Sequence, residues 1–295
     1  VDSEMCIRDR IRASIRFKHF KKTYDENILD IKGGLNDVVM NNSPIDIDKL
    51  IEGTNEILTA NRNSLQLFDM LHSMRQFDDL TYVHSVNVAL IASILGQWLK
   101  FSEKDIRILT ISGLLHDIGK IMIPNEILTK PGKLTVAEYN IMKQHVNFGY
   151  EKVKNQNIDI RIKEACLLHH EKCDGTGYPF GLKSDHIPAV AKIIAIADVY
   201  DAMTSARVYR GALCPFEVID TMYKDAFTKF EPEYILPFLK NVASSYINND
   251  VRLSDGRIGK VVLINENALS LPIVQCEDEF IDLSKTRGLT VSAIL

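Results

Sequence analysis

The sequence lacks several features that would each have assigned it to a class. No apolar run approaches the roughly 18 to 20 residues that a membrane-spanning helix needs, so no membrane span is expected. Basic residues are not in excess, because 35 Lys and Arg stand against 39 Asp and Glu and give a net charge of -4. A long nucleic-acid partner is therefore not expected, although a local basic pocket could bind a small phosphorylated ligand.

Paired cysteines are also missing. The five cysteines are an odd number, and none of them form a Cys-x-x-Cys motif. This usage is typical of reduced thiols in the cytosol and not of a disulfide framework. We therefore expect a cytoplasmic protein, and we interpret Cys166 and Cys173 as structural residues.

The N-terminus has neither an initiator Met nor the apolar segment of a signal peptide. Residues 3–10, SEMCIRDR, resemble translated sequencing-adaptor read-through. We interpret residues 1–10 as a non-native segment and leave them out of the expected fold. On that interpretation, natural sequence is missing upstream.

Helical periodicity runs through most of the chain. Residues 11–75 carry apolar side chains at helical spacing and form a predicted helical lead-in. Within residues 76–244, the stretch 83–99 is apolar almost all round, as in a helix buried inside a bundle. Capping patterns at Ser102 and Thr135 open two further helices, expected to extend to near Gly119 and to His145. The predicted fold is an all-α helical bundle whose main domain is residues 76–244.

The pattern changes near residue 245. Period-two alternation surrounds Asp255 and Gly256, a strong hairpin signal, and residues 272–276 and 280–284 are further candidate strands. Residues 245–295 are therefore expected to form a small β appendage.

Five histidines and two aspartates stand where ordinary structural roles explain them poorly. His84 and His116 interrupt apolar helices, and burying an imidazole without a partner is costly. Asp117 and Asp198 lie in apolar segments, where a carboxylate is costly unless it binds something positive. One shared metal centre would satisfy all these groups, and imidazole with carboxylate suits Fe, Mn, Zn or Ni better than Ca or Mg. The candidate ligands are His84, His116, Asp117, His145, His169, His170 and Asp198.

Seven ligands exceed what one ion usually takes from a protein. Two ions bridged by Asp117 are the economical arrangement, and such a pair clamps a phosphodiester while it generates a hydroxide nucleophile. The residues alone thus predict a dinuclear hydrolytic centre.

Several motifs, in order, resemble the HD-GYP family, a subfamily of the HD phosphohydrolases. They cover about residues 79–215 and are TYVHSVNV, LLHDIGKIMIPNEILTKPGKLT, the Gln144-His145 region, HHEKCDGTGYPFGL and IPAVAKIIAIADVYDAMTSARVYR. The resemblance implies the HD-domain fold and hydrolysis of cyclic di-GMP to pGpG, GMP or both. It also implies two transition-metal ions, iron or alternatively manganese, with a bridging hydroxide.

The resemblance places the family's metal ligands on the seven candidates. It implies that Asp117 and Lys120 are catalytic, that Lys120 also contacts a phosphate, and that Tyr178 binds the nucleotide. Arg207 and Arg210 are implied as further substrate contacts, although Val208 replaces the usual proline between them.

Two neighbouring acids, Asp201 and Glu171, are expected to orient ligands or to pair with Arg or Lys. Some members of the family bind a third ion through a glutamate just before the first histidine. Here Leu80 stands four residues before His84, and the nearest carboxylates are Asp78 and Asp79, so we expect two ions.

Three alternatives stay open. The enzyme could prefer another cyclic dinucleotide such as cyclic GMP-AMP, the domain could be a receptor that binds without cleaving, or the histidines could be satisfied core residues. A homodimer, an upstream sensory or receiver domain and a GGDEF-type partner are also left open.

Overall fold

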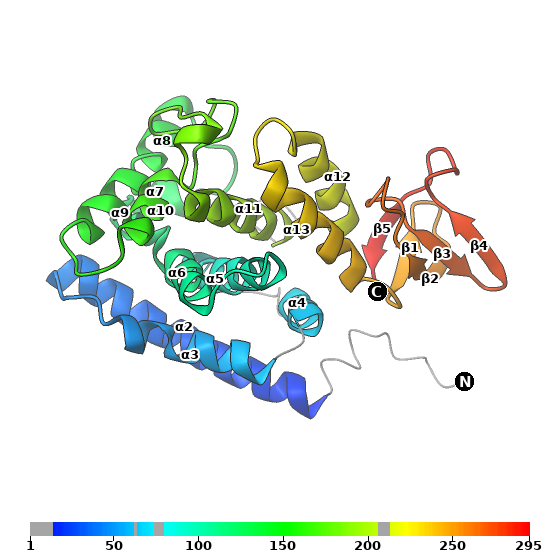
Figure 1. The fold of residues 1–295 in the computed structure, drawn as a ribbon, viewed down its shortest axis with the longest axis horizontal. Coiled ribbons are helices and arrows are strands. Elements are labelled where there is room, and N and C mark those ends of the chain that lie inside the picture. The colour runs from blue at the N-terminus through cyan, green and yellow to red at the C-terminus, as the bar shows by residue number, and fades with distance from the viewer. Residues whose placement is uncertain (1–13, 62–63, 74–79, 206–212) are drawn as a thin grey trace.

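A computed structural model, which describes residues 14–61, 64–73, 80–205 and 213–295, shows a helical bundle followed by a small sheet (Figure 1). This confirms the predicted fold class. The helices are α2 (Ile15–Asn41), α3 (Ile47–Ala60), α4 (Ser64–Ser73), α5 (Leu80–Trp98), α6 (Glu103–Leu115), η1 (Ile118–Met122), α7 (Asn125–Leu128), α8 (Val136–Met142), α9 (His145–Val153), α10 (Ile160–Leu168), η2 (Ser184–His186), α11 (Ala189–Thr204), α12 (Pro215–Asp225) and α13 (Pro232–Ser245).

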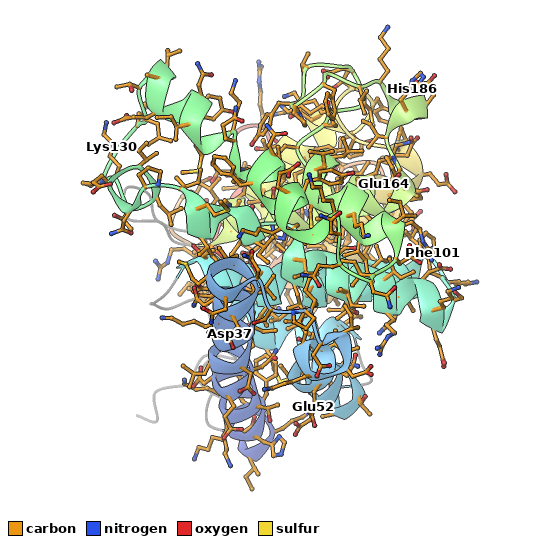
Figure 2. The ribbon with its side chains drawn as sticks, turned by 90° about the vertical axis from the view of Figure 1, so that its left-hand side faces the viewer. Asp37, Glu52, Phe101, Lys130, Glu164 and His186 are labelled. Carbon is orange, nitrogen blue, oxygen red and sulfur yellow. The ribbon has the colours of Figure 1, made fainter. Side chains whose placement is uncertain are left out.

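The N-terminal lead-in is a helical layer against one side of the bundle. α2 and α3 lie side by side below α5 and α6 in Figure 1, and the labels Asp37 and Glu52 place them there again in the turned view of Figure 2. The apolar faces of these helices enter the main core, which contains Phe20, Ile31 and Ile51. Packing of amphipathic faces, more than intrinsic propensity, stabilises such helices.

α5 lies in the middle of the bundle, as its all-round apolar sequence predicts. Its residues Val86 to Ala92 are buried, and α6 packs closely along it. A Cβ atom added at Gly113 of α6 would lie 2.4 Å from the Cα atom of Ala89 in α5. Only glycine permits this approach, which brings the end of α6 next to the start of α5.

The two predicted caps exist, but both helices end earlier than expected. Ser102 accepts a hydrogen bond from the backbone N–H of Asp105, and Thr135 with Glu138 forms a complete capping box. α6 stops at Leu115 and the chain continues as η1, while the segment after Thr135 divides into α8 and α9. The break brings η1 against α9, where a Cβ at Gly119 would lie 1.9 Å from a backbone oxygen.

The C-terminal strands form one antiparallel sheet in the order β4-β3-β2-β1-β5, beside α12 and α13 (Figure 1). The predicted hairpin joins β1 and β2, and Gly256 in its turn has a φ of 94°, which glycine adopts without strain. Both other predicted strands also exist. The strands are β1 (Asp250–Leu253), β2 (Ile258–Leu263), β3 (Ile273–Cys276), β4 (Glu279–Asp282) and β5 (Val291–Ile294).

None of the helices in the described ranges has both the length and the apolar character needed to cross a membrane.

Candidate metal centre

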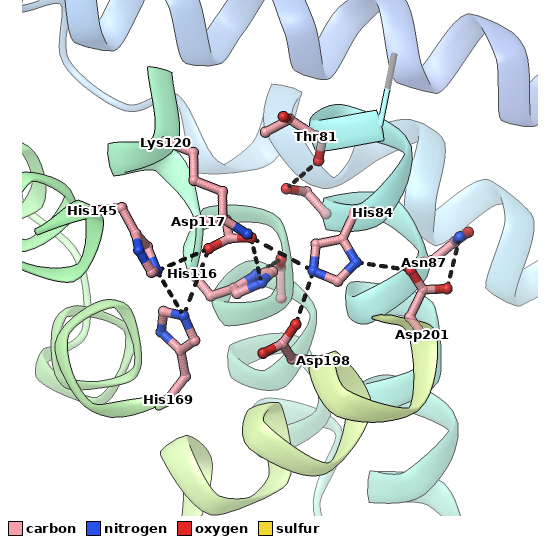
Figure 3. A network of polar contacts seen from close by, with 12 residues as sticks. Thr81, His84, Asn87, His116, Asp117, Lys120, His145, His169, Asp198 and Asp201 are labelled. Atoms are coloured by element: carbon pink, nitrogen blue, oxygen red, sulfur yellow. Dashed lines mark hydrogen bonds and ion pairs between the residues drawn. The ribbon is translucent and has the colours of Figure 1, made fainter. Parts of the chain in front are cut away.

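All seven predicted ligands meet in the middle of the helical bundle. Figure 3 shows them apart from His170. They form two adjoining groups, and within each group one ligand atom per residue lies within 4.8 Å of the others. The first group is Asp117, His145, His169 and His170, and the second is His84, His116 and Asp198.

The ligands come from five helices that are distant in sequence. His84 lies in the first turns of α5, and Asp198 lies within α11. His116 directly follows α6, His145 begins α9, and His169 directly follows α10. Helix ends therefore supply most of the site, which places the side chains around a common point while the helices pack against one another.

Three of the histidines are oriented by backbone carbonyls one turn before them. A carbonyl oxygen can only accept, so the Nδ1 atom must carry the proton and the Nε2 lone pair is left to face the centre. These carbonyls lie in the last turn of a helix, where intrahelical donors are few. The oxygen of Ala165 also accepts the backbone N–H of His169 at 3.2 Å. The contacts run from His116 to Gly113 at 2.7 Å, from His145 to Met142 at 2.8 Å and from His169 to Ala165 at 2.9 Å.

Asp117 stands between the two groups, with one carboxylate oxygen directed to each. Its Oδ2 atom is 3.3 Å from Nε2 of His116 and 3.5 Å from Nε2 of His84. Its Oδ1 atom is 3.2 Å from Nε2 of His145 and 3.7 Å from Nε2 of His169. This is the arrangement that a carboxylate bridging two ions requires.

The buried charge of Asp117 is stabilised by its neighbours. Burial raises the pKa of its carboxyl group, but its interactions with His116 and with the charge of Lys120 outweigh that effect and hold the pKa well below its usual range. Lys120, in η1, forms an ion pair with Asp117. The centre is thus built around an ionised carboxylate.

Two buried atoms test whether a cation fits. Nε2 of His116 and Oδ1 of Asp117 have no hydrogen-bond partner among the described residues, and unsatisfied buried polar atoms are costly. Both point into the centre, and both are ordinary metal-ligand atoms. The donor set and the orphaned atoms fit a divalent metal ion.

Two aspartates, Asp198 and Asp201, contact the two ring nitrogens of His84. Its Nδ1 atom lies 2.8 Å from Oδ2 of Asp201, and its Nε2 atom lies 2.9 Å from Oδ1 of Asp198. Burial lowers the pKa of His84, but its hydrogen bonds to the two aspartates and their charges outweigh burial and raise the pKa to about 9. Asp201 in turn accepts from Asn87, which accepts from Tyr24 of α2.

His169 and His170 have the opposite character. Burial lowers the pKa of His169 to about 4, and burial with the neighbouring His169 lowers the pKa of His170 well below its usual range. Neutral imidazoles of this kind are ready to bind a metal. The ring of Tyr178 stacks on His170, with centroids 4.7 Å apart and planes at 28°.

Glu171 differs in role from the expectation. Its buried carboxylate accepts three backbone N–H bonds, from Phe180 at 2.7 Å, Gly181 at 3.1 Å and Leu182 at 2.9 Å. It therefore holds the glycine-rich loop folded beside the centre, and neither Arg nor Lys is among these partners. A Cβ at Gly177 would lie 2.4 Å from the Cα atom of Glu171, so the loop needs glycine there.

The predicted substrate contacts divide into two sets. Lys120 and Tyr178 lie at the centre, as described above. Arg207 and Arg210 lie outside the described residues, as do Asp78 and Asp79.

Sequence reasoning missed the groups that orient the ligands. The three carbonyls cannot be recognised from residue types, although each donor histidine follows or begins a helix. Asn87, three residues after His84, is buried and polar within an apolar helix, and that signal could have identified it.

A family model described as the HD domain matches residues 52–234. The chain is 36% identical over 203 residues to a cyclic di-GMP phosphodiesterase of Pseudomonas aeruginosa, covering 68% of this chain and 49% of that protein. A cyclic di-GMP phosphodiesterase response regulator of Xanthomonas campestris is 36% identical, with 66% and 52% covered. A 3'3'-cGAMP-specific phosphodiesterase of Vibrio cholerae is 30% identical, with 79% and 46% covered.

Among solved structures, a HDG"Y"P protein from Bdellovibrio bacteriovorus is similar in fold, with a TM-score of 0.56 and 18% identity over 78% of this chain and 74% of that chain. The chain spans about half the length of the curated relatives named above.

Proposed function

The chain belongs to the HD domain family, and within it to the HD-GYP type that its motifs predict, and from this premise we propose that it hydrolyses cyclic di-GMP in the cytoplasm. The observation that carries the proposal is the placement of Asp117 between two groups of ligands, which suits a pair of ions on one phosphodiester. The proposed products are pGpG, GMP or both.

The proposed centre holds two ions, iron or alternatively manganese, on the seven ligands. When bound, such ions supply Lewis acidity at the phosphoryl oxygens and lower the pKa of water. Imidazole and carboxylate ligands suit both metals.

The protein's own groups have separate proposed roles around that centre. Asp117 links the two groups of ligands, because each of its two oxygens faces one group. Lys120 would neutralise charge that develops on the non-bridging oxygens of the phosphate. The aromatic face of Tyr178, fixed on His170, would position the nucleotide, and Arg207 and Arg210 are proposed as further contacts.

The second candidate substrate is cyclic GMP-AMP, because a relative at 30% identity is named as specific for it. The two substrates share the phosphodiester chemistry and differ in one base. Comparison of kcat/KM on both decides between them.

The direct test is anaerobic metal analysis combined with product detection on cyclic di-GMP, after loading with Fe²⁺ or Mn²⁺. We expect about two ions per chain, as a two-ion centre requires, and release of pGpG or GMP. Folded, metal-loaded protein that binds cyclic di-GMP without cleaving it would instead favour a receptor. Folded protein that takes up no transition metal would favour satisfied core histidines.

A matched pair of histidine variants gives the control. His116→Ala removes a buried ligand, whereas His186→Ala removes an exposed histidine outside the centre, paired with Asp185. We expect the first to lose metal and hydrolysis and the second to retain both.

A further inference from the structure

Beside the metal centre lies a lysine that neither the motifs nor the ligand geometry assigns to a role. Lys143 directly follows α8 and precedes the ligand His145 by two residues. Its Nζ atom lies over two tyrosine rings, 5.3 Å from the centroid of Tyr139 and 6.0 Å from that of Tyr178. The second ring is the one that stacks on His170.

Lys143 differs from Lys120 in how its charge is used. Lys120 is paired with the carboxylate of Asp117 and so belongs to the metal-binding core. Within the described part of the chain, the half-buried Lys143 has no carboxylate at ion-pair distance. Its neighbours are ring faces, which attract the ammonium group and hold it in place without neutralising it. A positioned, unneutralised cation at the edge of a phosphodiesterase centre is suited to an anionic part of the ligand.

A cyclic dinucleotide carries two phosphodiesters joined through two riboses. When one phosphodiester lies at the metal ligands, the other must lie to the side of the centre, with a negative charge that the metal ligands do not contact. We propose that Lys143 binds this second, uncleaved phosphodiester, and that Tyr139 and Tyr178 hold the ammonium group in position for it. This inference rests on the proposed function.

The proposal distinguishes substrates by their number of phosphodiesters. Lys143→Gln should raise KM for cyclic di-GMP about tenfold, which is what loss of one charge-assisted contact costs. It should leave turnover of bis(p-nitrophenyl) phosphate unchanged, because that compound has one phosphodiester only. Lys143→Arg should retain most of the affinity, and added KCl should weaken binding more in the wild type than in Lys143→Gln.

Matched variants separate this role from nearby structural effects. Lys133→Gln removes an exposed lysine just before α8 and should leave every parameter unchanged. Tyr139→Leu removes one ring beneath Lys143 and should raise KM for cyclic di-GMP, whereas Tyr139→Phe keeps the ring face and should not. Metal content and melting temperature are measured for each variant, to confirm that the centre is intact.

Equal loss on both substrates would overturn the proposal, because Lys143 would then act on the reacting phosphate or on the metal ligands. The proposal would also be overturned if Lys143→Gln had the same KM for cyclic di-GMP as the control Lys133→Gln. Calorimetric binding of cyclic di-GMP to metal-loaded protein is measured in parallel. If the wild type binds but does not cleave, and Lys143→Gln binds about tenfold more weakly, only the proposed hydrolysis fails. If the wild type does not bind, both fail.

Discussion

The metal centre and the C-terminal sheet bury opposite kinds of residue. Seven ionisable side chains of the centre and its surroundings are at most 6% exposed, namely His116, Asp117, His145, His169, Glu171, Asp198 and Asp201. In β1 to β5, which are described in full, the buried positions hold only apolar residues or glycine, such as Val251, Val261 and Val274.

The difference teaches which region serves stability and which serves chemistry. A buried carboxylate or imidazole costs free energy unless it is paired, so a cluster of them persists only where the fold imposes it and a ligand can use it. The sheet follows the alternation of its sequence and leaves no such cost. Changes at the centre should therefore affect metal and hydrolysis first, and changes in the sheet should affect stability alone.

The largest expected effect comes from Asp117→Ala. It removes a carboxylate that directs one oxygen to each ligand group, so metal content should fall. Hydrolysis of cyclic di-GMP should drop at least about a hundredfold, since loss of groups behind the ligands already costs about 10–100-fold. Metal analysis and product detection check this. Full activity in the variant would show that Asp117 is not needed for hydrolysis.

A smaller loss is expected when a residue behind the ligands changes. Asp201→Asn keeps the shape of the side chain but removes the charge that fixes Nδ1 of His84. We expect metal affinity to weaken about 10- to 100-fold, with the fold retained, as is usual for such partners. Titration against a chromophoric chelator measures it, and unchanged affinity would show that the charge of Asp201 does not contribute to metal binding.

Metal affinity should also depend on pH through His84. The pKa of His84 in the metal-free protein is about 9, above the ordinary value of 6.5. The pairing of protonated His84 with the two aspartates therefore stabilises the metal-free protein fully below pH 6.5, and this stabilisation is lost as the pH rises through 9. A metal needs the neutral ring, so affinity should rise about tenfold per pH unit between 6.5 and 9.

The comparison for that titration is Asp201→Asn, in which the pKa of His84 should be lower and the pH dependence should end at a lower pH. Affinity that does not change over this range in the wild type would contradict the assignment of His84 as a ligand.

The smallest effect on hydrolysis is expected in the sheet. Val274→Ala opens a cavity at a fully buried position of β3, opposite Val261 and Ile281, and should lower the free energy of unfolding by about 2 kcal/mol. Denaturant unfolding measures the loss. Metal content and kcat/KM should remain unchanged, and a matching loss of activity would mean that the sheet supports the centre directly.

Much of the fold was predictable because local periodicity encodes it. The all-round apolar stretch of α5 required a buried helix, and the alternation around Asp255 and Gly256 required a hairpin. The end of α6 was not predictable, because Leu115 to Gly119 continue an apolar helical pattern. The chain leaves that helix after Leu115, and Gly119 in the following η1 meets the backbone of α9, a contact between segments far apart in sequence.

The seven candidate ligands could be named from the sequence itself, because ionisable residues within apolar segments need a partner and the motifs around them indicate a metal. Only the tertiary structure decided how they divide into two groups, that Asp117 directs one oxygen to each, and that carbonyls of Gly113, Met142 and Ala165 set the ring orientations. The same holds for Lys143 over its two tyrosines. Residue types specify which groups need a partner, whereas distances between helices packed from remote parts of the chain decide which partners they meet.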